Sequence, residues 1–553
     1  MIQWGYSIKH PVKPVKINIA LPDIPESELT PLVKNLLLII EQLLVQNQQQ
    51  AEEIERLKDD INILKGQKKR PVFEGSKLDK KISAKNAAAK RKKKRPGSNK
   101  KKKTQKLVVH EDKVIQPDVP IPEGSRFKGY RYFTVQDLHI SVHTTRYCLE
   151  RWVTPDNKAL TGQLPTTLDN RHFGPQLVSY ILYQHHHCQT TQPLLLEQLR
   201  EWGVDISSGQ INHLLLSGKD RFHCEKDTLL QTGLAVSPYI TVDDSGARHQ
   251  GKNGYVTQMG NELFAWFQST NSKSRINFLE LLRAGKSDYC INDAALLYMQ
   301  QQKLPDTPLG KLRQHQRQAI ANEEEWLALL DDLSISNQRH RRIATEGALM
   351  GTVLNEGLCD DLVIVSDDAG QFNILLHALC WVHTERLIHK MIPLNDTHRK
   401  EIAQIRDQIW RFYADLKDYK EQADELRRTT LDRRFDEIFL QKTSYETLNQ
   451  TLKRIHANKT ELLRVLDRPE IPLHTNGSET DIRDYVKKRK VSGGTRSDEG
   501  RQCRDTFASL KKTCRKLDVS FWHYLLDRLG AGLQPIPPLS DIIADRASFA
   551  TGY

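Results

Sequence analysis

The sequence has few of the features that mark membrane or secreted proteins. No apolar run reaches the roughly 18–20 residues that a helix needs to span a bilayer. The N-terminus lacks the positive-then-apolar layout of a signal peptide. The eight cysteines stand mostly singly among apolar residues, which is typical of reduced core thiols and not of a disulfide framework. These absences predict a cytosolic protein without a membrane partner.

Metal-ligand spacing of the zinc type is also scarce. No CxxC pair occurs, and Cys148 and Cys188 stand apart. Cys380 and His383 form a CxxH, and His185 opens an HHHC that ends at Cys188. Each of these offers half of the four ligands that a structural zinc site requires. We therefore predict no zinc.

The positive charge is concentrated in one segment. The formal net charge is +13, and residues 77–106 contain fifteen Lys or Arg and one Asp, so the rest of the chain is nearly neutral. Like charges at this density repel one another, which predicts a disordered basic linker over residues 67–107. Such a segment suits phosphate contacts that ignore base sequence, although a solvated spacer has the same composition. The candidate contacts are Lys92, Lys93, Lys94, Arg95, Lys101 and Lys102.

A heptad pattern precedes this linker. Residues 1–28 are rich in proline and are expected to be irregular. Within residues 29–66, apolar side chains step alternately by four and three from Leu36 to Leu64, with Asn47 at an a position. The pattern favours a parallel coiled coil, and a polar a residue fixes its register. We expect a homodimer or higher oligomer through this coiled coil; the alternative is one amphipathic helix packed on its own domain.

Residues 108–238 predict a globular, mostly helical region that binds DNA, after a strand-like opening at residues 130–142. Within it, residues 193–216 resemble a helix-turn-helix: Pro193 suits a first helical turn, Gly203 ends that helix, and Ser207 or Ser208 can cap the next. An ordinary helical hairpin has the same signals. The side chains that could contact base edges are Gln210, Asn212 and His213.

The remainder alternates strands and helices in an order compatible with an α/β core of RNase H-like type. Strand-like segments open at Tyr239, and a near-continuous apolar strand ends at Asp367. Two polar helical stretches interrupt the pattern and are expected to be large insertions. The predicted parts are a core over 239–394 with an insertion over 286–360, a second insertion over 395–470, the C-terminal part of the core over 471–530, and a tail over 531–553.

Three acids stand where such a core would bring them together. Asp243 ends the first strand, Asp367 ends the buried strand, and Glu479 lies in the first turn of a late helix. Carboxylates are the hard oxygen ligands that Mg²⁺ prefers, and two Mg²⁺ ions about 3.5–4 Å apart can activate both oxygens of a phosphodiester transfer. The alternative to metal binding is a structural role, in which the Asp residues form turns and the Glu caps a helix.

From about Gly129 to Leu529 the sequence resembles bacterial transposases of insertion-sequence family sixty-six, especially the branch with a long helical insertion. The matching stretches are DDSGARHQGKNGYVTQMGNELFAWF, TNSKSRINFLELL, VSDDAGQF followed by CWVH, and TNGSETDIRDYVKKRKVSGGTRSDEG. The resemblance implies a DDE transposase in which Asp243, Asp367 and Glu479 hold Mg²⁺, for which Mn²⁺ can substitute. Asp244 and Asp368 are adjacent rivals, and strand alternation favours Asp243 over Asp244.

The same resemblance implies the partners. They are double-stranded DNA, as the inverted-repeat ends and the target, and accessory proteins of the same element, in the nucleoid of a bacterial cytoplasm. Arg483, one helical turn after Glu479, could orient that carboxylate or hold a phosphate, and His383 would support the site or contact DNA. Two alternatives stay open: a catalytically silent DNA-binding regulator, and a nuclease of the same fold that cuts without joining. The basic residues expected to flank the site are Lys487, Lys488 and Arg489.

Overall fold

The structure is a computed structural model that describes residues 30, 50, 108–165, 168, 172–318, 320–355, 361–393 and 395–550. The predicted irregular N-terminus, coiled coil and basic linker lie outside these residues, apart from positions 30 and 50. The chain divides into two units, residues 1–138 and 139–553.

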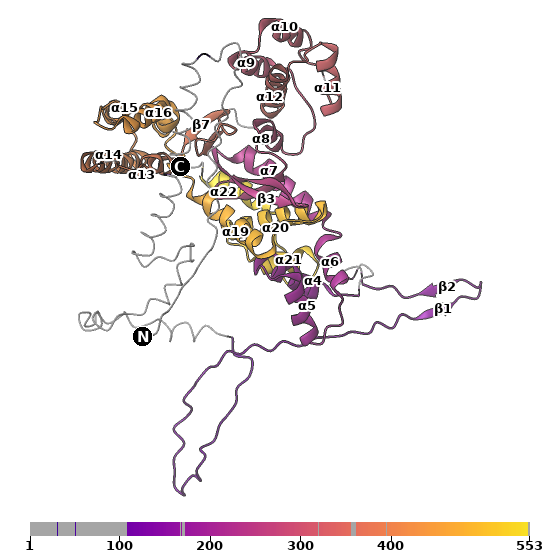
Figure 1. The fold of residues 1–553 in the computed structure, drawn as a ribbon. Helices are drawn as coiled ribbons and strands as arrows, with labels where there is room; N and C mark the ends of the chain where they lie inside the picture. Colours follow the sequence, from indigo (N-terminus) through magenta and orange to yellow (C-terminus); the bar gives the residue numbers. More distant parts are fainter. Residues whose placement is uncertain are drawn as a thin grey trace, which may run out of the picture. The chain divides into compact units, whose positions relative to one another are not determined.

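A five-stranded mixed sheet forms the centre of the second unit (Figure 1). Its order is β5 (Ala265–Thr270), β4 (Lys252–Gly260), β3 (Tyr239–His249), β6 (Val363–Ser366) and β7 (Leu376–Leu379). Strands β3, β4 and β5 form an antiparallel meander, whereas β6 pairs in parallel with β3 and β7 in parallel with β6. The central strand β3 and its neighbour β6 therefore run in the same direction, and β3 continues in its pairing with β4 beyond the last residue of β6.

The two faces of the sheet bury different cores. On β3, Ile240 and Val242 pack into the larger core, while Tyr239 packs into a second core on the opposite face. On β6, Val363 and Val365 belong to the same second core as Tyr239. Because side chains alternate along a strand, the odd-numbered residues of both strands share one face.

Helix α20 (Asp498–Lys516) covers the free edge of the sheet at β5. Three of its polar side chains, spaced four residues apart, accept hydrogen bonds from alternate backbone N–H groups of β5. An edge strand left uncovered would expose these groups to pairing with other chains. The pairs are Ala265 N–H with Thr513 at 3.1 Å, Phe267 N–H with Ser509 at 2.9 Å, and Ser269 N–H with Asp505 at 2.7 Å.

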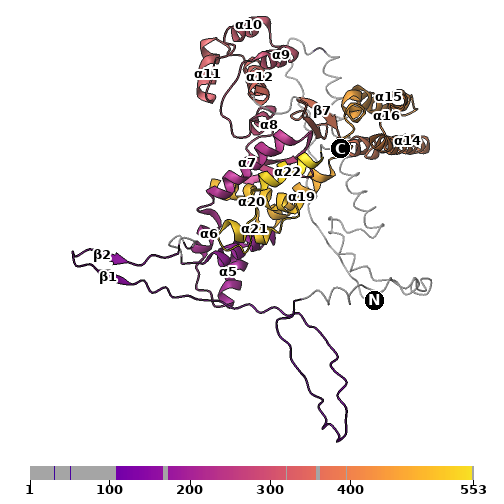
Figure 2. The ribbon, with the colours of Figure 1, turned by 180° about the vertical axis from the view of Figure 1, so that it is seen from behind.

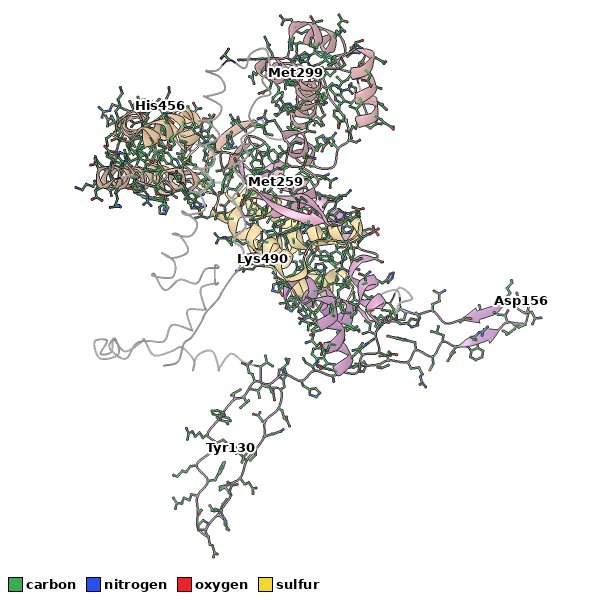
Figure 3. The ribbon with its side chains drawn as sticks, viewed as in Figure 1. Tyr130, Asp156, Met259, Met299, His456 and Lys490 are labelled. Atoms are coloured by element: carbon green, nitrogen blue, oxygen red, sulfur yellow. The ribbon has the colours of Figure 1, made fainter. Side chains whose placement is uncertain are left out.

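Two groups of helices interrupt the sheet order and extend from it in different directions (Figures 1 and 2). The first lies between β5 and β6, and Met299 belongs to it (Figure 3). The second lies between β7 and α19 (Asn476–Ser492), and His456 belongs to it. The first group is α8 (Arg275–Leu282), α9 (Asp293–Gln301), α10 (Asp306–Gln314), α11 (Glu323–Asp332) and α12 (Gln338–Asn355). The second is α13 (Trp381–His389), α14 (Asp396–Glu421), α15 (Glu425–Phe439), α16 (Glu446–Ala457), α17 (Lys459–Leu462) and α18 (Arg464–Asp467).

The prediction for residues 108–238 was wrong for its first part. Residues 130–142, expected to form a strand, have no regular structure, and the side chains of Tyr132 and Phe133 are 82% and 91% exposed. Before the first helix of this region, the described residues contain only the short hairpin of β1 (Arg151–Val153) and β2 (Ala159–Thr161). An isolated two-stranded ribbon buries too little apolar surface to support a core.

Helices begin at Pro175 and lead into the sheet. Those of this region are α4 (Pro175–Leu182), the π-helical turn η3 (Tyr183–His187), α5 (Gln192–Glu201), α6 (Ser208–Leu216) and α7 (Asp220–Val236). After α20 follow α21 (Phe521–Arg528) and α22 (Leu539–Ala550), so the predicted tail contains a helix, which contacts α7. Among the described residues, no helix combines the length and apolar character that crossing a bilayer requires.

Candidate functional site

Asp367 directly follows β6, and Asp243 lies beside it within β3. That strand was predicted to end at Asp243, but it continues to His249 in its pairing with β4. The parallel register pairs Thr241 with Val365, and two further residues along each strand bring Asp243 level with Asp367. Neighbouring strands are about 4.8 Å apart. Burial raises the pKa of Asp243 to about 6, and the nearby carboxylate of Asp367 contributes to the rise. The two strands thus hold a pair of mutually repelling carboxyl groups at one edge of the sheet.

Helix α19 places Glu479 over the same face. The Ser478 hydroxyl, in the first turn of α19, donates a hydrogen bond of 2.5 Å to the Thr241 hydroxyl, and both residues are buried. Thr241 precedes Asp243 by two residues and therefore points to the same face of β3. The first turn of the helix that carries Glu479 is consequently fixed on the strand that carries Asp243.

Three basic side chains surround the carboxylate of Glu479. Arg386 Nη1 donates to Glu479 Oε1 at 3.2 Å, and His383 Nε2 lies 3.5 Å from the same oxygen. Arg483 Nη2 donates to the other oxygen, Oε2, at 3.0 Å. Arg386 also lies 3.2 Å from His383 Nε2. Both carboxylate oxygens of Glu479 are therefore occupied by cations or by a group that can become one.

The acids fit a divalent cation only in part. Within the described part of the chain, no three His, Cys, Asp or Glu side chains gather closely enough to hold a metal ion. Asp243 and Asp367 offer the oxygen donors that Mg²⁺ prefers, and a cation between them would relieve the repulsion that contributes to the raised pKa of Asp243. Glu479 instead faces Arg386 and Arg483. The two aspartates fit the metal, and the third ligand is not assembled with them.

Both rival acids are engaged elsewhere. The Asp244 carboxylate accepts hydrogen bonds from Thr257 Oγ1 at 2.6 Å and from Gln371 Nε2 at 2.9 Å. Strand alternation puts these contacts on the face of β3 opposite to Asp243. Asp368 forms an ion pair with Arg454 of α16. These partners favour Asp243 and Asp367 as the functional pair.

A cavity of about 390 Å³ opens beside Asp367, and both Cys380 and His383 line it. The Cys380 thiol, buried at the start of α13, raises the pKa of His383, and burial of His383 works against that rise. Arg386 lines the same cavity and was not recognised in the sequence. Its only sequence signal is its position on α13 one turn after His383.

The basic run after Glu479 does not form one surface. Lys487 is exposed and lies 3.5 Å from Asp484. Lys488 is buried and donates to the His185 carbonyl at 2.7 Å. Arg489 lies beside Gly246 of β3. These three side chains, predicted as one flank of the site, leave α19 in different directions, as residues 100° apart on a helix must.

The helix-turn-helix candidate consists of α5 and α6. Ser207 caps α6 through a capping box, in which its hydroxyl accepts from Gln210 N–H at 3.2 Å and its own N–H donates to Gln210 Oε1 at 2.8 Å. Asn212 and His213 are exposed on α6. The Gln210 side chain is thus used locally, whereas Asn212 and His213 face outward.

Acids on two neighbouring parallel strands and on a crossing helix are typical of enzymes that transfer phosphodiesters with divalent cations. Residues 306–503 match the model of a family described as "Transposase IS66 family". The chain belongs to this family of transposases.

A curated relative covers a larger part of the chain. The chain is 45% identical over 321 residues to the uncharacterized protein y4jO of Sinorhizobium fredii (strain NBRC 101917 / NGR234). This match spans 58% of the chain and the whole of that protein.

Proposed function

We propose that the chain is a DNA transposase that cleaves and rejoins strands at the ends of an insertion sequence, with Asp243, Asp367 and Glu479 as its catalytic acids. The observation that carries the proposal is the parallel register of β3 and β6, which sets Asp367 beside Asp243. The sheet order, with a meander on one side of β3 and two parallel strands on the other, supports an RNase H-like core. The contact between Ser478 and Thr241 supports Glu479 as the third acid.

Asp243 and Asp367 would hold Mg²⁺, for which Mn²⁺ can substitute. When bound, the metal supplies Lewis acidity toward the attacking and leaving oxygens of the phosphodiester. The chain's own cations have a separate task. The guanidinium groups of Arg386 and Arg483 can bind phosphate oxygens, and a phosphate that takes these arginines releases Glu479 to join the aspartates. DNA entry and completion of the acid triad are then one event.

The remaining assignments extend this proposal to DNA recognition and assembly. Asn212 and His213 on α6 are exposed and suit contacts with base edges. The basic linker would contact phosphates, and the coiled coil would join two or more copies on the paired ends. Accessory proteins of the same element would complete the assembly, as the family's layout implies.

The decisive test compares Asp367→Asn with Asp368→Asn. The substrate is a DNA fragment that carries the ends of the element, and cleaved and joined strands are measured with Mg²⁺. Asp367→Asn removes a ligand worth several kcal/mol to the transition state, so activity should fall about a thousandfold or more. Asp368→Asn removes a partly exposed ion pair and should leave activity within about threefold. Both variants should bind the DNA as the wild type does.

Two other outcomes would support different functions. A wild-type chain that binds the ends without cleaving them would be a DNA-binding regulator. A wild-type chain that hydrolyses DNA but forms no joined product from pre-cleaved ends would be a nuclease. If Asp367→Asn cleaves and joins at the wild-type rate, the assignment of the site is wrong.

A further inference from the structure

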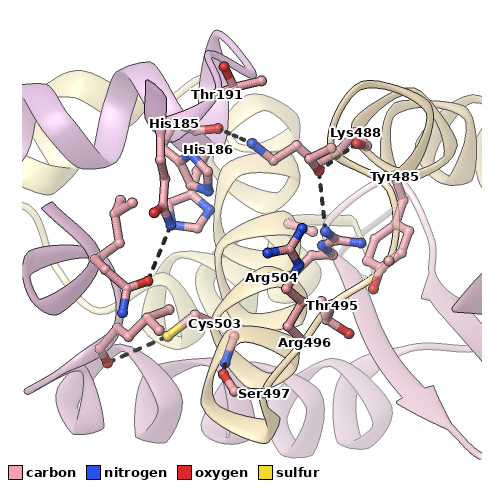
Figure 4. Close-up of a pocket in the computed structure, with 18 of the residues that line it drawn as sticks. His185, His186, Thr191, Tyr485, Lys488, Thr495, Arg496, Ser497, Cys503 and Arg504 are labelled. Carbon is pink, nitrogen blue, oxygen red and sulfur yellow. Dashed lines mark hydrogen bonds between the residues drawn. The ribbon is translucent and has the colours of Figure 1, made fainter. Parts of the chain in front are cut away.

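A second cavity, of about 600 Å³, lies between α6, η3, α19 and α20 (Figure 4). It is separate from the proposed catalytic acids, since none of Asp243, Asp367 and Glu479 lines it. Basic residues dominate one part of its lining, and two of them, Lys512 and Lys488, are buried, at 4% and 9% exposure. The other basic residues of the lining are His185, His186, Arg496, Arg504 and Lys511.

Three of these cations have only neutral partners. Lys488 Nζ donates to the His185 carbonyl at 2.7 Å. Arg504 donates to the Gly493 carbonyl and the Ser492 hydroxyl, both at 3.3 Å. Lys511 Nζ donates to the His186 carbonyl at 3.4 Å. Of the ion pairs between described residues, none includes Lys488, Arg504 or Lys511.

The acids that line the cavity are neutralised by other lysines. Asp481 lies 2.9 Å from Lys516 and 3.6 Å from Lys512. Asp484 lies 2.7 Å from Lys512 and 3.5 Å from Lys487. Lys488 and Arg504 are thus left without a carboxylate partner among the described residues, whereas Asp484 compensates the nearby charge of Lys511 in part.

The uncompensated charge is electrostatically costly. Burial, together with the nearby charges of Arg504 and Lys511, lowers the pKa of Lys488 to about 7. Burial and the charge of Lys488 together lower the pKa of His185 to about 4. A buried cation next to like charges is stabilised when an anion joins it.

The loop between α19 and α20 shapes one wall of this cavity. Its Thr495 N–H donates to the Arg248 carbonyl at 3.0 Å, and the Gln250 N–H donates to the Thr495 carbonyl at 2.8 Å. Gly494 permits this close approach, because a Cβ at that position would lie 2.5 Å from the Arg248 carbonyl oxygen. The fixed loop brings Arg496 and the N-terminus of the 19-residue helix α20 to the cavity. A helix N-terminus favours anions and here adds to the side-chain cations.

We propose that this cavity binds a phosphate group through Lys488, Arg504 and Lys511. Gln192 and Asn212 of the helix-turn-helix candidate also line it, and α19 carries Glu479 on another side. A DNA strand that contacts α6 on its way to the acids would therefore place a backbone phosphate here. This DNA source rests on the proposed function, whereas phosphate binding by the cavity does not. A small phosphate-bearing molecule shares the same chemistry.

The first arm of the test uses inorganic phosphate as the probe. Titration calorimetry and thermal unfolding of the full chain are compared for the wild type, Lys488→Met and Lys488→Arg. We expect phosphate to bind the wild type and raise its Tm, Lys488→Met to weaken binding at least tenfold, and Lys488→Arg to retain most of it. The matched control is Lys453→Met, which removes one charge from an exposed position on α16 and should bind phosphate normally.

The second arm distinguishes the two phosphate sources. The affinity for a duplex carrying the element's end is measured against salt concentration for the same variants. If a DNA phosphate occupies the cavity, Lys488→Met should lower the magnitude of the slope of log K against log salt by about one. If inorganic phosphate binding is lost while DNA affinity and slope are unchanged, the occupant is a small phosphate-bearing molecule. Either result supports the phosphate site.

The proposal is overturned if Lys488→Met binds phosphate as the wild type does, or if the wild type binds none. Should Lys488→Met fail to unfold cooperatively, Arg504→Met gives the same test from another side chain of the cavity. Failure of the proposed function is distinguishable, because Asp367→Asn abolishes strand joining without altering phosphate binding. A chain that binds phosphate but never cleaves DNA would retain this site and lose the transposase assignment.

Discussion

Arg386 on α13 donates a hydrogen bond of 3.2 Å to Glu479 on α19, across 93 residues of sequence. The bond joins the two helices that flank Asp243 of β3 and Asp367 at the end of β6. Arg483 binds the other oxygen of the same carboxylate at 3.0 Å. Glu479 is thereby held by cations, and the same cations are suited to phosphate.

Replacing Arg386 should tighten the binding of divalent cations. Arg386→Gln removes one positive charge near Glu479 and the aspartates, which are the proposed metal ligands. One charge at this range in a half-buried site is worth about 1 kcal/mol, so we expect Mn²⁺ affinity to rise about three- to tenfold. Calorimetric titration of the DNA-free chain with Mn²⁺ measures it.

The control for this experiment is Arg399→Gln. Arg399 is exposed on α14 and pairs with Asp396, so its loss should leave Mn²⁺ affinity unchanged. Equal or weaker Mn²⁺ binding by Arg386→Gln would show that Arg386 does not compete with the metal.

The raised pKa of Asp243 predicts a pH-dependent stability difference between the wild type and Asp243→Asn. The folded state binds the Asp243 proton more tightly than the unfolded chain does, because the folded pKa is about 6 and the ordinary value is 3.8. The contribution of this group to stability is thus greatest below pH 4 and is lost as the pH rises to 6. With about 1.4 kcal/mol for each pKa unit, the wild type should lose up to about 3 kcal/mol relative to Asp243→Asn.

Urea unfolding of the two metal-free proteins between pH 4 and pH 8 measures this difference. Other groups titrate in both proteins and cancel in the comparison. A difference that stays constant across the range would mean that Asp243 has an ordinary pKa.

The strands and the two aspartates follow from local sequence. Residues 239–243 alternate, and residues 362–368 form an apolar run that ends in acids. These periods indicate a half-buried and a fully buried strand. Asp367 follows the end of β6, whereas β3 continues past Asp243 to His249. Alternation alone also separates Asp243 from Asp244, and the contacts of Asp244 with Thr257 and Gln371 agree with that separation.

Local sequence patterns did not predict two features of the structure: the partners of Glu479 and the lack of a strand at residues 130–142. Arg386 contacts Glu479 only because the second group of helices brings α13 and α19 together. The hydrophobic periodicity of the sequence cannot predict such a contact between distant elements. At residues 130–142 the alternation indicates a capacity to be half-buried, but among the described residues no strand pairs with this segment, and Phe133 stays exposed. A pattern predicts an element only where the fold provides a surface for it.

The side-chain ladder between α20 and β5 predicts a stability effect at Ser509. Ser509→Ala leaves the buried Phe267 N–H without its acceptor, and an unsatisfied buried donor costs about 1–3 kcal/mol. Chemical denaturation of the full chain should show this loss in the free energy of unfolding. Thr451→Ala, at a half-buried position of α16 that contacts no strand backbone, should cost less than about 0.5 kcal/mol. Equal stabilities for the two variants would mean that α20 does not satisfy the edge of the sheet.

The two polar residues Gln210 and His213 of α6 should separate stability from DNA recognition. Gln210→Ala breaks the capping box with Ser207 and should cost about 1 kcal/mol of stability, while the preference for the element's end over a shuffled duplex is kept. His213 is exposed, so His213→Ala should leave stability unchanged and reduce that preference by about 1–3 kcal/mol. Denaturation and competition binding on both variants measure the two quantities. If Gln210→Ala lowers the preference and His213→Ala does not, the base contacts lie at the start of α6, and the capping role of Gln210 is secondary to them.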